Sequence, residues 1–176
     1  QSLPLVEEAE GLQLLRWLLG EDVDEAPQRG RPWLLGPVYH SRPLALDYGA
    51  TGDGYGASNP RVRLFFGSAD GVLHAVENTD AAGRESGREV FGFLPQSALA
   101  ALHRRRSAES PVPVAYGIDG SPVALRVDRN GDGTLRVDEG DEAIVVFGQR
   151  RGGSRYYALN VSDPLRPPSL QWRIER

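Results

Sequence analysis

The stretch PVALRVDRNGDGTLRVDEGDEAIVVF, residues 122–147, decides the fold of this chain. Its two ends, 122–127 and 143–147, are short apolar runs rich in β-branched residues, a composition typical of β-strands. The residues between them, Asp128 to Glu139, have the spacing of a twelve-residue calcium loop. The stretch therefore predicts an ion-binding loop between two strands, and not the helix–loop–helix unit of an EF-hand.

The loop places oxygen ligands at alternate positions, as a hard cation requires. The side chains at positions 1, 3 and 5 are Asp128, Asn130 and Asp132. Gly133 at position 6 permits a sharp turn, Thr134 at position 7 offers its carbonyl, and Glu139 at position 12 closes the shell. Arg136 at position 9 opposes a cation. The sequence predicts a Ca²⁺ site of moderate affinity that orders a long connection; an Asp- and Asn-rich turn without an ion is the alternative.

The strand pattern occurs twice along the chain. The first set of strand-like runs lies at 43–46, 62–68, 72–76 and 89–93, and the second at 122–125, 144–149, 156–160 and 170–174. Four short strands separated by Gly, Asp, Asn and Pro are typical of a propeller blade. Two blades cannot close a propeller, so we expect a mainly β protein with about two antiparallel four-stranded blades, part of a larger domain or covered by helices.

Two further segments have helical spacing. In the first, apolar residues recur from Val6 to Leu19, with Leu12 and Leu15 among them, and Gly20 ends the helix. The second is the insertion 96–106. The predicted organisation is a lead-in helix and linker over 1–32, a first blade-like unit over 33–95, a helical insertion and linker over 96–121, and a second unit with the calcium loop over 122–176.

Composition narrows the class of protein. With 176 residues, 40% of them hydrophobic, and 21 glycines and 13 prolines, the chain has enough apolar surface for one core rich in turns. The net charge of −4 gives no reason to expect a nucleic-acid partner or an anionic membrane. The absence of cysteine excludes disulfides and cysteine-ligated zinc. The sequence shows no signal peptide and no membrane-spanning apolar run, so an exported protein would be represented here by a processed form or a fragment.

Five motifs occur in a fixed order: GPVYHSRP at 36–43, FGSADGVLHA at 66–75, FGFLP at 91–95, YGIDGSP at 116–122 and GGSRYYALNVSDP at 152–164. Over about residues 6–176 this series resembles the PilC/PilY family of type IV pilus tip proteins. The resemblance implies a segment of their C-terminal, quinoprotein-like β-propeller, with a calcium loop and a function in pilus biogenesis, adhesion and twitching motility.

The same resemblance implies a location at the bacterial cell surface, the outer membrane or the pilus tip. Its implied partners are the minor pilins or tip complex and a host-surface receptor. The family's metal loop often has Asp at position 9, where this chain has Arg136. The last ligand is therefore expected from Glu139 or Asp138.

Two alternatives stay open: a fragment of a dehydrogenase that uses pyrroloquinoline quinone, and a purely structural propeller module. The dehydrogenase would need a closed ring and a catalytic Asp beside the ion, and spacing supports no catalytic arrangement of Ser, His and Asp or of paired carboxylates. His40 and His74 lie beside strands, where structural hydrogen bonding is expected. We expect a binding or adhesion module and not an enzyme.

Overall fold

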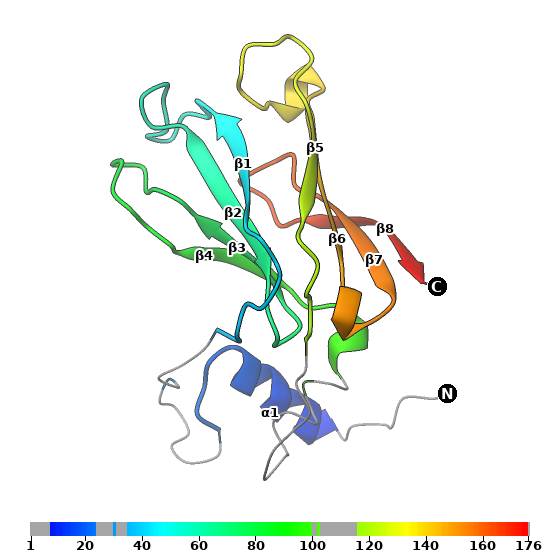
Figure 1. Ribbon diagram of the computed structural model, residues 1–176. Coiled ribbons are helices and arrows are strands. Elements are labelled where there is room, and N and C mark those ends of the chain that lie inside the picture. The colour runs from blue at the N-terminus through cyan, green and yellow to red at the C-terminus, as the bar shows by residue number, and fades with distance from the viewer. Residues whose placement is uncertain (1–7, 24–29, 31–34, 100–101, 103–115, 176) are drawn as a thin grey trace.

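The computed structural model describes residues 8–23, 30, 35–99, 102 and 116–175. It contains two four-stranded antiparallel sheets and little helix (Figure 1). The first sheet has the order β1 (Leu44–Gly49), β2 (Arg61–Gly67), β3 (Leu73–Glu77) and β4 (Glu89–Phe93). The second has the order β5 (Val123–Val127), β6 (Glu142–Gly148), β7 (Arg155–Asn160) and β8 (Ser169–Glu175). The predicted mainly β architecture is confirmed, and the two sheets do not close on themselves.

The described helices are short. The predicted N-terminal helix is confirmed as α1 (Glu8–Leu18), and Gly20 follows it with a left-handed φ of 97°. Leu14 is buried, whereas Leu12 and Leu15 of the expected apolar side are exposed. The insertion begins with η1 (Gln96–Ala98), and most of the predicted helix 96–106 lies outside the described residues. None of the described helices is long and apolar enough to span a membrane.

The two sheets repeat the same register of side chains. Phe65 of β2 lies opposite Ala75 of β3 in the first sheet, as Val146 of β6 lies opposite Ala158 of β7 in the second. The matched positions, first-sheet residue first, are Leu44 and Val123, Leu46 and Leu125, Arg63 and Ile144, Phe65 and Val146, Glu77 and Asn160, Phe91 and Trp172. The internal repeat predicted from the sequence is therefore a repeat of strand pairing.

In the described part of the chain, one of these matched faces is covered and the other is largely exposed. Leu46 and Phe65 lie in the core between the sheets and are 3% and 0% exposed. Their counterparts lie on the far face of the second sheet, where Leu125 is 54% and Trp172 41% exposed. The second sheet thus covers one face of the first and leaves its own equivalent face open.

The other face of each sheet also carries equivalent side-chain pairs at equivalent positions. Phe66 stacks on His74 with ring centroids 5.3 Å apart, and at the corresponding positions Phe147 stacks on Tyr157 at 5.4 Å. Phe147 and Tyr157 point into the core between the sheets. The sheets therefore stack head to tail and not face to face about a two-fold axis.

Candidate metal centre

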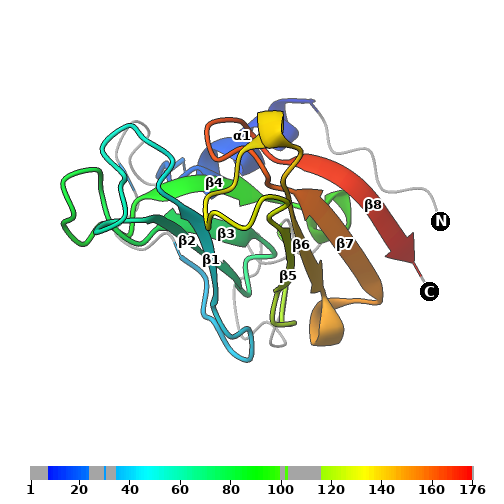
Figure 2. The same cartoon turned by 90° about the horizontal axis from the view of Figure 1, so that it is seen from above.

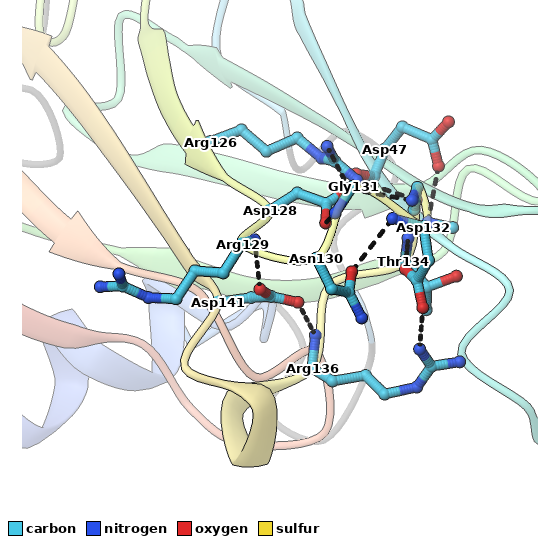
Figure 3. Close-up of polar contacts among 12 residues, drawn as sticks. Asp47, Arg126, Asp128, Arg129, Asn130, Gly131, Asp132, Thr134, Arg136 and Asp141 are labelled. Carbon is cyan, nitrogen blue, oxygen red and sulfur yellow. Dashed lines mark hydrogen bonds and ion pairs between the residues drawn. The ribbon is translucent and has the colours of Figure 1, made fainter.

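The loop that follows β5 lies at the end of the sheets opposite α1 (Figure 1). Its polar side chains fold back onto its own backbone (Figure 3). Asp128 accepts the N–H of Gly133 at 2.9 Å, Asn130 Oδ1 accepts the N–H of Asp132 at 3.0 Å, and Asp132 Oδ1 accepts that of Thr134 at 2.7 Å. Such local bonds are the usual way in which Asp and Asn shape a turn. They hold positions 1, 3 and 5 in one compact loop.

The structure distinguishes the two acidic residues expected to supply the last ligand. Both belong to a short 3₁₀ helix, η2 (Val137–Glu139). Glu139 Oε2 lies 2.7 Å from Asn130 Nδ2, within the loop. Asp138 instead lines a neighbouring groove of about 1000 Å³, formed with Asn160, residues 162–167 and Ser169. Of the two acidic residues, Glu139 is therefore the one whose carboxylate lies close to the other candidate ligands of the loop.

Arg136 lies on the same side of the loop as these oxygens. Its Nη1 is 2.6 Å from Asp132 Oδ2 and 3.7 Å from Glu139 Oε2. The N–H of Thr134 and the Arg136 guanidinium both lower the pKa of Asp132. In the described part of the chain, no group of three or more Asp, Glu or His side chains is gathered as a metal site requires. In this arrangement the arginine balances part of the loop's negative charge.

The loop residues fit a hard cation in kind and in order. Every candidate ligand presents oxygen, which Ca²⁺ prefers, and Gly133 has the positive φ, 86°, that position 6 of a calcium loop requires. The Arg136 guanidinium is a stand-in cation, since it already occupies a place between two of the carboxylates. Direct coordination by Asp132 and Glu139 requires that guanidinium to turn away.

Asp141 fixes the neck of the loop, a role that sequence reasoning missed. One carboxylate oxygen accepts the N–H of Arg129 at 2.8 Å and the other accepts that of Arg136 at 2.9 Å. These two donors lower the pKa of Asp141, whose side chain is buried. The available signal was an acidic residue directly after Gly140, the left-handed residue that ends η2.

The loop packs against the first sheet as well as belonging to the second. The Leu135 N–H donates to the Tyr48 carbonyl at 2.9 Å, and the Ala50 N–H donates to Thr134 Oγ1 at 3.2 Å. Leu135 is 3% exposed and is part of the core. A Cβ on Gly49 would lie 2.3 Å from the loop backbone, so only glycine fits there. The loop is thus a bridge between the two sheets.

Arg126 strengthens this bridge. Its Nε donates to the Asp47 carbonyl at 3.1 Å, and its Nη2 donates to the Gly133 carbonyl at 2.8 Å (Figure 3). Its Nη1 lies 3.4 Å from Asp128. The sequence showed a basic residue at the end of a strand, but only the proximity of β1 makes it a connection between sheets.

A second polar cluster lies in the first sheet. Ser68 Oγ is 2.9 Å from His74 Nε2, and His74 Nδ1 is 2.6 Å from Glu89 Oε1. Asp70 also bonds Ser68. Burial opposes ionisation of Asp70, yet its bonds with His74 and Ser68 lower its pKa to about 2; despite burial, the bonds with Asp70 and Glu89 raise the pKa of His74.

The contacts resemble those of a hydrolase triad, but their surroundings differ. Ser68 is 1% exposed, so its hydroxyl offers no surface to a substrate. The cluster ties the β2–β3 turn to β4. His74 makes the hydrogen bonds predicted for it, and so does His40, whose Nδ1 lies 2.7 Å from the buried Asp119.

In comparisons with known proteins, no family model, curated protein or solved structure matches this chain.

Proposed function

We propose that this chain is a calcium-binding, non-enzymatic β-propeller segment of a type IV pilus tip protein, in which the ordered loop 128–139 holds two blades together. One observation carries the metal-binding part of the proposal. The loop that contains the ligand pattern contributes Leu135 to the core and bonds the backbone of Tyr48 in the neighbouring sheet. The order of this loop and the stability of the interface between the sheets are therefore coupled.

The ligands are Asp128, Asn130, Asp132, the carbonyl of Thr134 and Glu139. A bound Ca²⁺ supplies two positive charges to three carboxylates that otherwise repel one another. Asp128 and Asp132 already accept loop N–H groups, so they can be fixed without refolding the turn. Because strands and not helices flank the loop, its effect is to stiffen an interface and not to open a groove.

Three features support the propeller part. The sheets repeat head to tail, which radial repetition requires. The first strands, β1 and β5, contact one another while the sheets splay apart beyond them (Figure 2). The far face of the second sheet exposes Leu125, Trp172 and Ile174, and in the first sheet the equivalent face is covered by the next sheet. A further four-stranded sheet fits that position.

The pilus assignment rests on the resemblance of the five ordered motifs. The proposed location, at the bacterial surface or pilus tip, rests on the same resemblance. So do the proposed partners, which are minor pilins or host-surface receptors. In this setting, calcium bound by Asp128, Asp132 and Glu139 makes the pair of blades more rigid. That rigidity in turn affects pilus biogenesis, adhesion or twitching.

Calcium titration of the 176-residue chain tests the metal site. The melting temperature and the heat of titration are measured for the wild type, Asp132→Ala and the control Asp138→Ala, whose replaced side chain lines the adjacent groove. We expect saturable binding and a rise in melting temperature for the wild type and the control, and neither for Asp132→Ala. Identical behaviour of the wild type and Asp132→Ala would show that the loop is an ordinary turn.

A separate experiment tests the pilus assignment. Asp132→Ala is introduced into the chromosomal gene of the bacterium that encodes the chain, and surface pili, adhesion and twitching zones are measured. We expect a change in at least one of them, with Asp138→Ala as the control. Unchanged pili and motility after deletion of the whole segment would overturn the assignment and leave the metal site standing.

A further inference from the structure

The feature of the loop that its ligand pattern does not explain is the position of Arg136. Position 9 of a calcium loop faces the ion and usually supplies a ligand or a ligand-bound water. Here it holds a guanidinium whose Nη1 lies 2.6 Å from Asp132 Oδ2, at position 5, and 3.7 Å from Glu139 Oε2, at position 12. The chain's own cation therefore bridges two of the three carboxylates that the metal needs.

The Arg136 guanidinium and the two carboxylates beside it are partly exposed to solvent. The side chains of Arg136, Asp132 and Glu139 are 39%, 39% and 36% exposed. Exposed ion pairs contribute little to stability and exchange readily with water. Arg136 can therefore turn outward while the backbone stays in place, because its N–H remains bonded to Asp141.

Two other arginines in or beside the loop, Arg129 and Arg126, have different positions. Arg129 donates its Nε to the Gly140 carbonyl at 2.6 Å, at the neck. Arg126 is bonded to two backbone carbonyls and links the sheets. Among the described residues, Arg136 is thus the guanidinium that bridges Asp132 and Glu139.

We propose that Arg136 is an internal counter-ion of this loop, which holds Asp132 and Glu139 together without a metal and must turn outward before a divalent cation can bind them. The proposal rests on the calcium-binding function proposed above and concerns how that site is regulated. Removal of the Arg136 charge leaves two carboxylates repelling one another in the metal-free loop and removes a competitor of the ion. The affinity for calcium then rises, while the stability of the metal-free protein changes little, because the ion pairs that are lost are exposed.

The test compares Arg136→Gln with Arg129→Gln. Both variants remove one positive charge from the same loop, but Arg129 does not bridge the carboxylates. Calcium affinity is measured by titration calorimetry at fixed ionic strength, and melting temperature is measured with chelator and with saturating calcium. We expect Arg136→Gln to bind calcium about tenfold more tightly, equivalent to about 1.4 kcal/mol, and Arg129→Gln to stay within about twofold of the wild type. The calcium-induced rise in melting temperature is expected to be largest for Arg136→Gln.

The outcomes separate this inference from the function on which it rests. Equal calcium affinity in the wild type and Arg136→Gln overturns the counter-ion role while leaving calcium binding intact. An equal gain in both variants assigns the effect to net charge and also overturns it. Binding by Arg136→Gln alone supports the counter-ion role and overturns calcium binding by the wild type. If wild type and both variants show no binding, both proposals fail.

Discussion

Leu46 and Leu125 are the same residue at the same position of two repeated sheets, yet one is 3% and the other 54% exposed. The local pattern is equal, because each leucine lies on a first strand opposite the second strand of its sheet. What differs is the neighbour: the second sheet covers Leu46, and no described segment covers Leu125. Whether a strand face is buried therefore depends on which sheet packs against it and not on the strand's own sequence.

The loops of the two repeats differ in a complementary way. In the first repeat, β1 approaches its neighbour at its last residue, Gly49, while in the second repeat the β5–β6 connection carries the carboxylates and inserts Leu135 into the core. The glycine of one repeat makes room for the backbone of the other. The predicted metal-site pattern is therefore found where the two sheets meet.

The largest expected effect concerns a pair that only the first sheet contains. Arg63 and Glu77 are each 3% exposed and form an ion pair at 3.2 Å, where the second sheet has Ile144 and Asn160. Glu77→Leu leaves a buried guanidinium without its carboxylate and is expected to cost about 3–5 kcal/mol in urea unfolding.

The double variant Arg63→Met/Glu77→Leu is its control. Because it removes both charges, most of the lost stability is expected to return. A double variant no more stable than Glu77→Leu would show that the hydrogen bond from Arg63 to the Pro164 carbonyl, and not the ion pair with Glu77, carries the effect.

The next largest difference in stability is expected between substitutions of the two equivalent leucines, Leu46 and Leu125. Leu46→Ala is expected to destabilise the chain by about 2–5 kcal/mol, because it opens a cavity in a packed core. Leu125→Ala is expected to change stability by no more than about 0.5 kcal/mol, as exposed sites usually do. Both are measured by denaturant unfolding. Equal costs would mean that the far face of the second sheet is covered in solution.

The cluster at His74 makes the first sheet sensitive to pH, whereas the second has Tyr157 at that position. Because folding lowers the pKa of Asp70 from 3.8 to about 2, its contribution of about 2 kcal/mol is present above pH 4 and is lost as the pH falls toward 2. His74 has a raised pKa, so its contribution is present below pH 6.5 and is lost as the pH rises through the raised value.

Unfolding free energies across this pH range test the assignment. Asp70→Asn is expected to remove the loss of stability at acid pH, and His74→Gln the loss of stability above pH 6.5. Asp163→Asn, at a partly exposed carboxylate of the second repeat, is the control and should leave both losses unchanged. An unaltered loss of stability at acid pH in Asp70→Asn would contradict the role of this carboxylate.

The smallest effect concerns a hydrogen bond between the repeats. Tyr48 donates its hydroxyl to the Val161 carbonyl at 2.8 Å inside the core. Tyr48→Phe leaves that carbonyl without this donor and is expected to cost about 1 kcal/mol. Tyr156→Phe, at a tyrosine 54% exposed on the far face, should be close to neutral in the same measurement. A neutral Tyr48→Phe would mean that water replaces the bond.

Much of the fold was predictable because it depends on local chemistry. The short apolar run rich in β-branched residues at 143–147 identifies β6 from its own sequence, and Gly20 marks the end of α1. In the loop, Asp128, Asn130 and Asp132 bond N–H groups within a few residues, so spacing alone locates the turn.

The rest depends on contacts that spacing does not encode. Glu139 and Asp138 are adjacent in sequence, and only the turn of η2 separates the one that faces the loop from the one that faces the groove. Asp141 binds two N–H groups seven residues apart. Arg126 bonds Asp47 in β1 and Thr134 bonds Ala50 just after it, both about eighty residues earlier in the chain.

The sequence by itself determined the eight strands, the repeat of their order and the oxygen pattern from Asp128 to Glu139, because each follows from residue type and short-range spacing. The tertiary structure decided which sheet face is buried, that the loop bridges both sheets, and that Arg136 lies between Asp132 and Glu139. Burial and charge pairing depend on which surfaces meet in space, and chain position alone does not fix that.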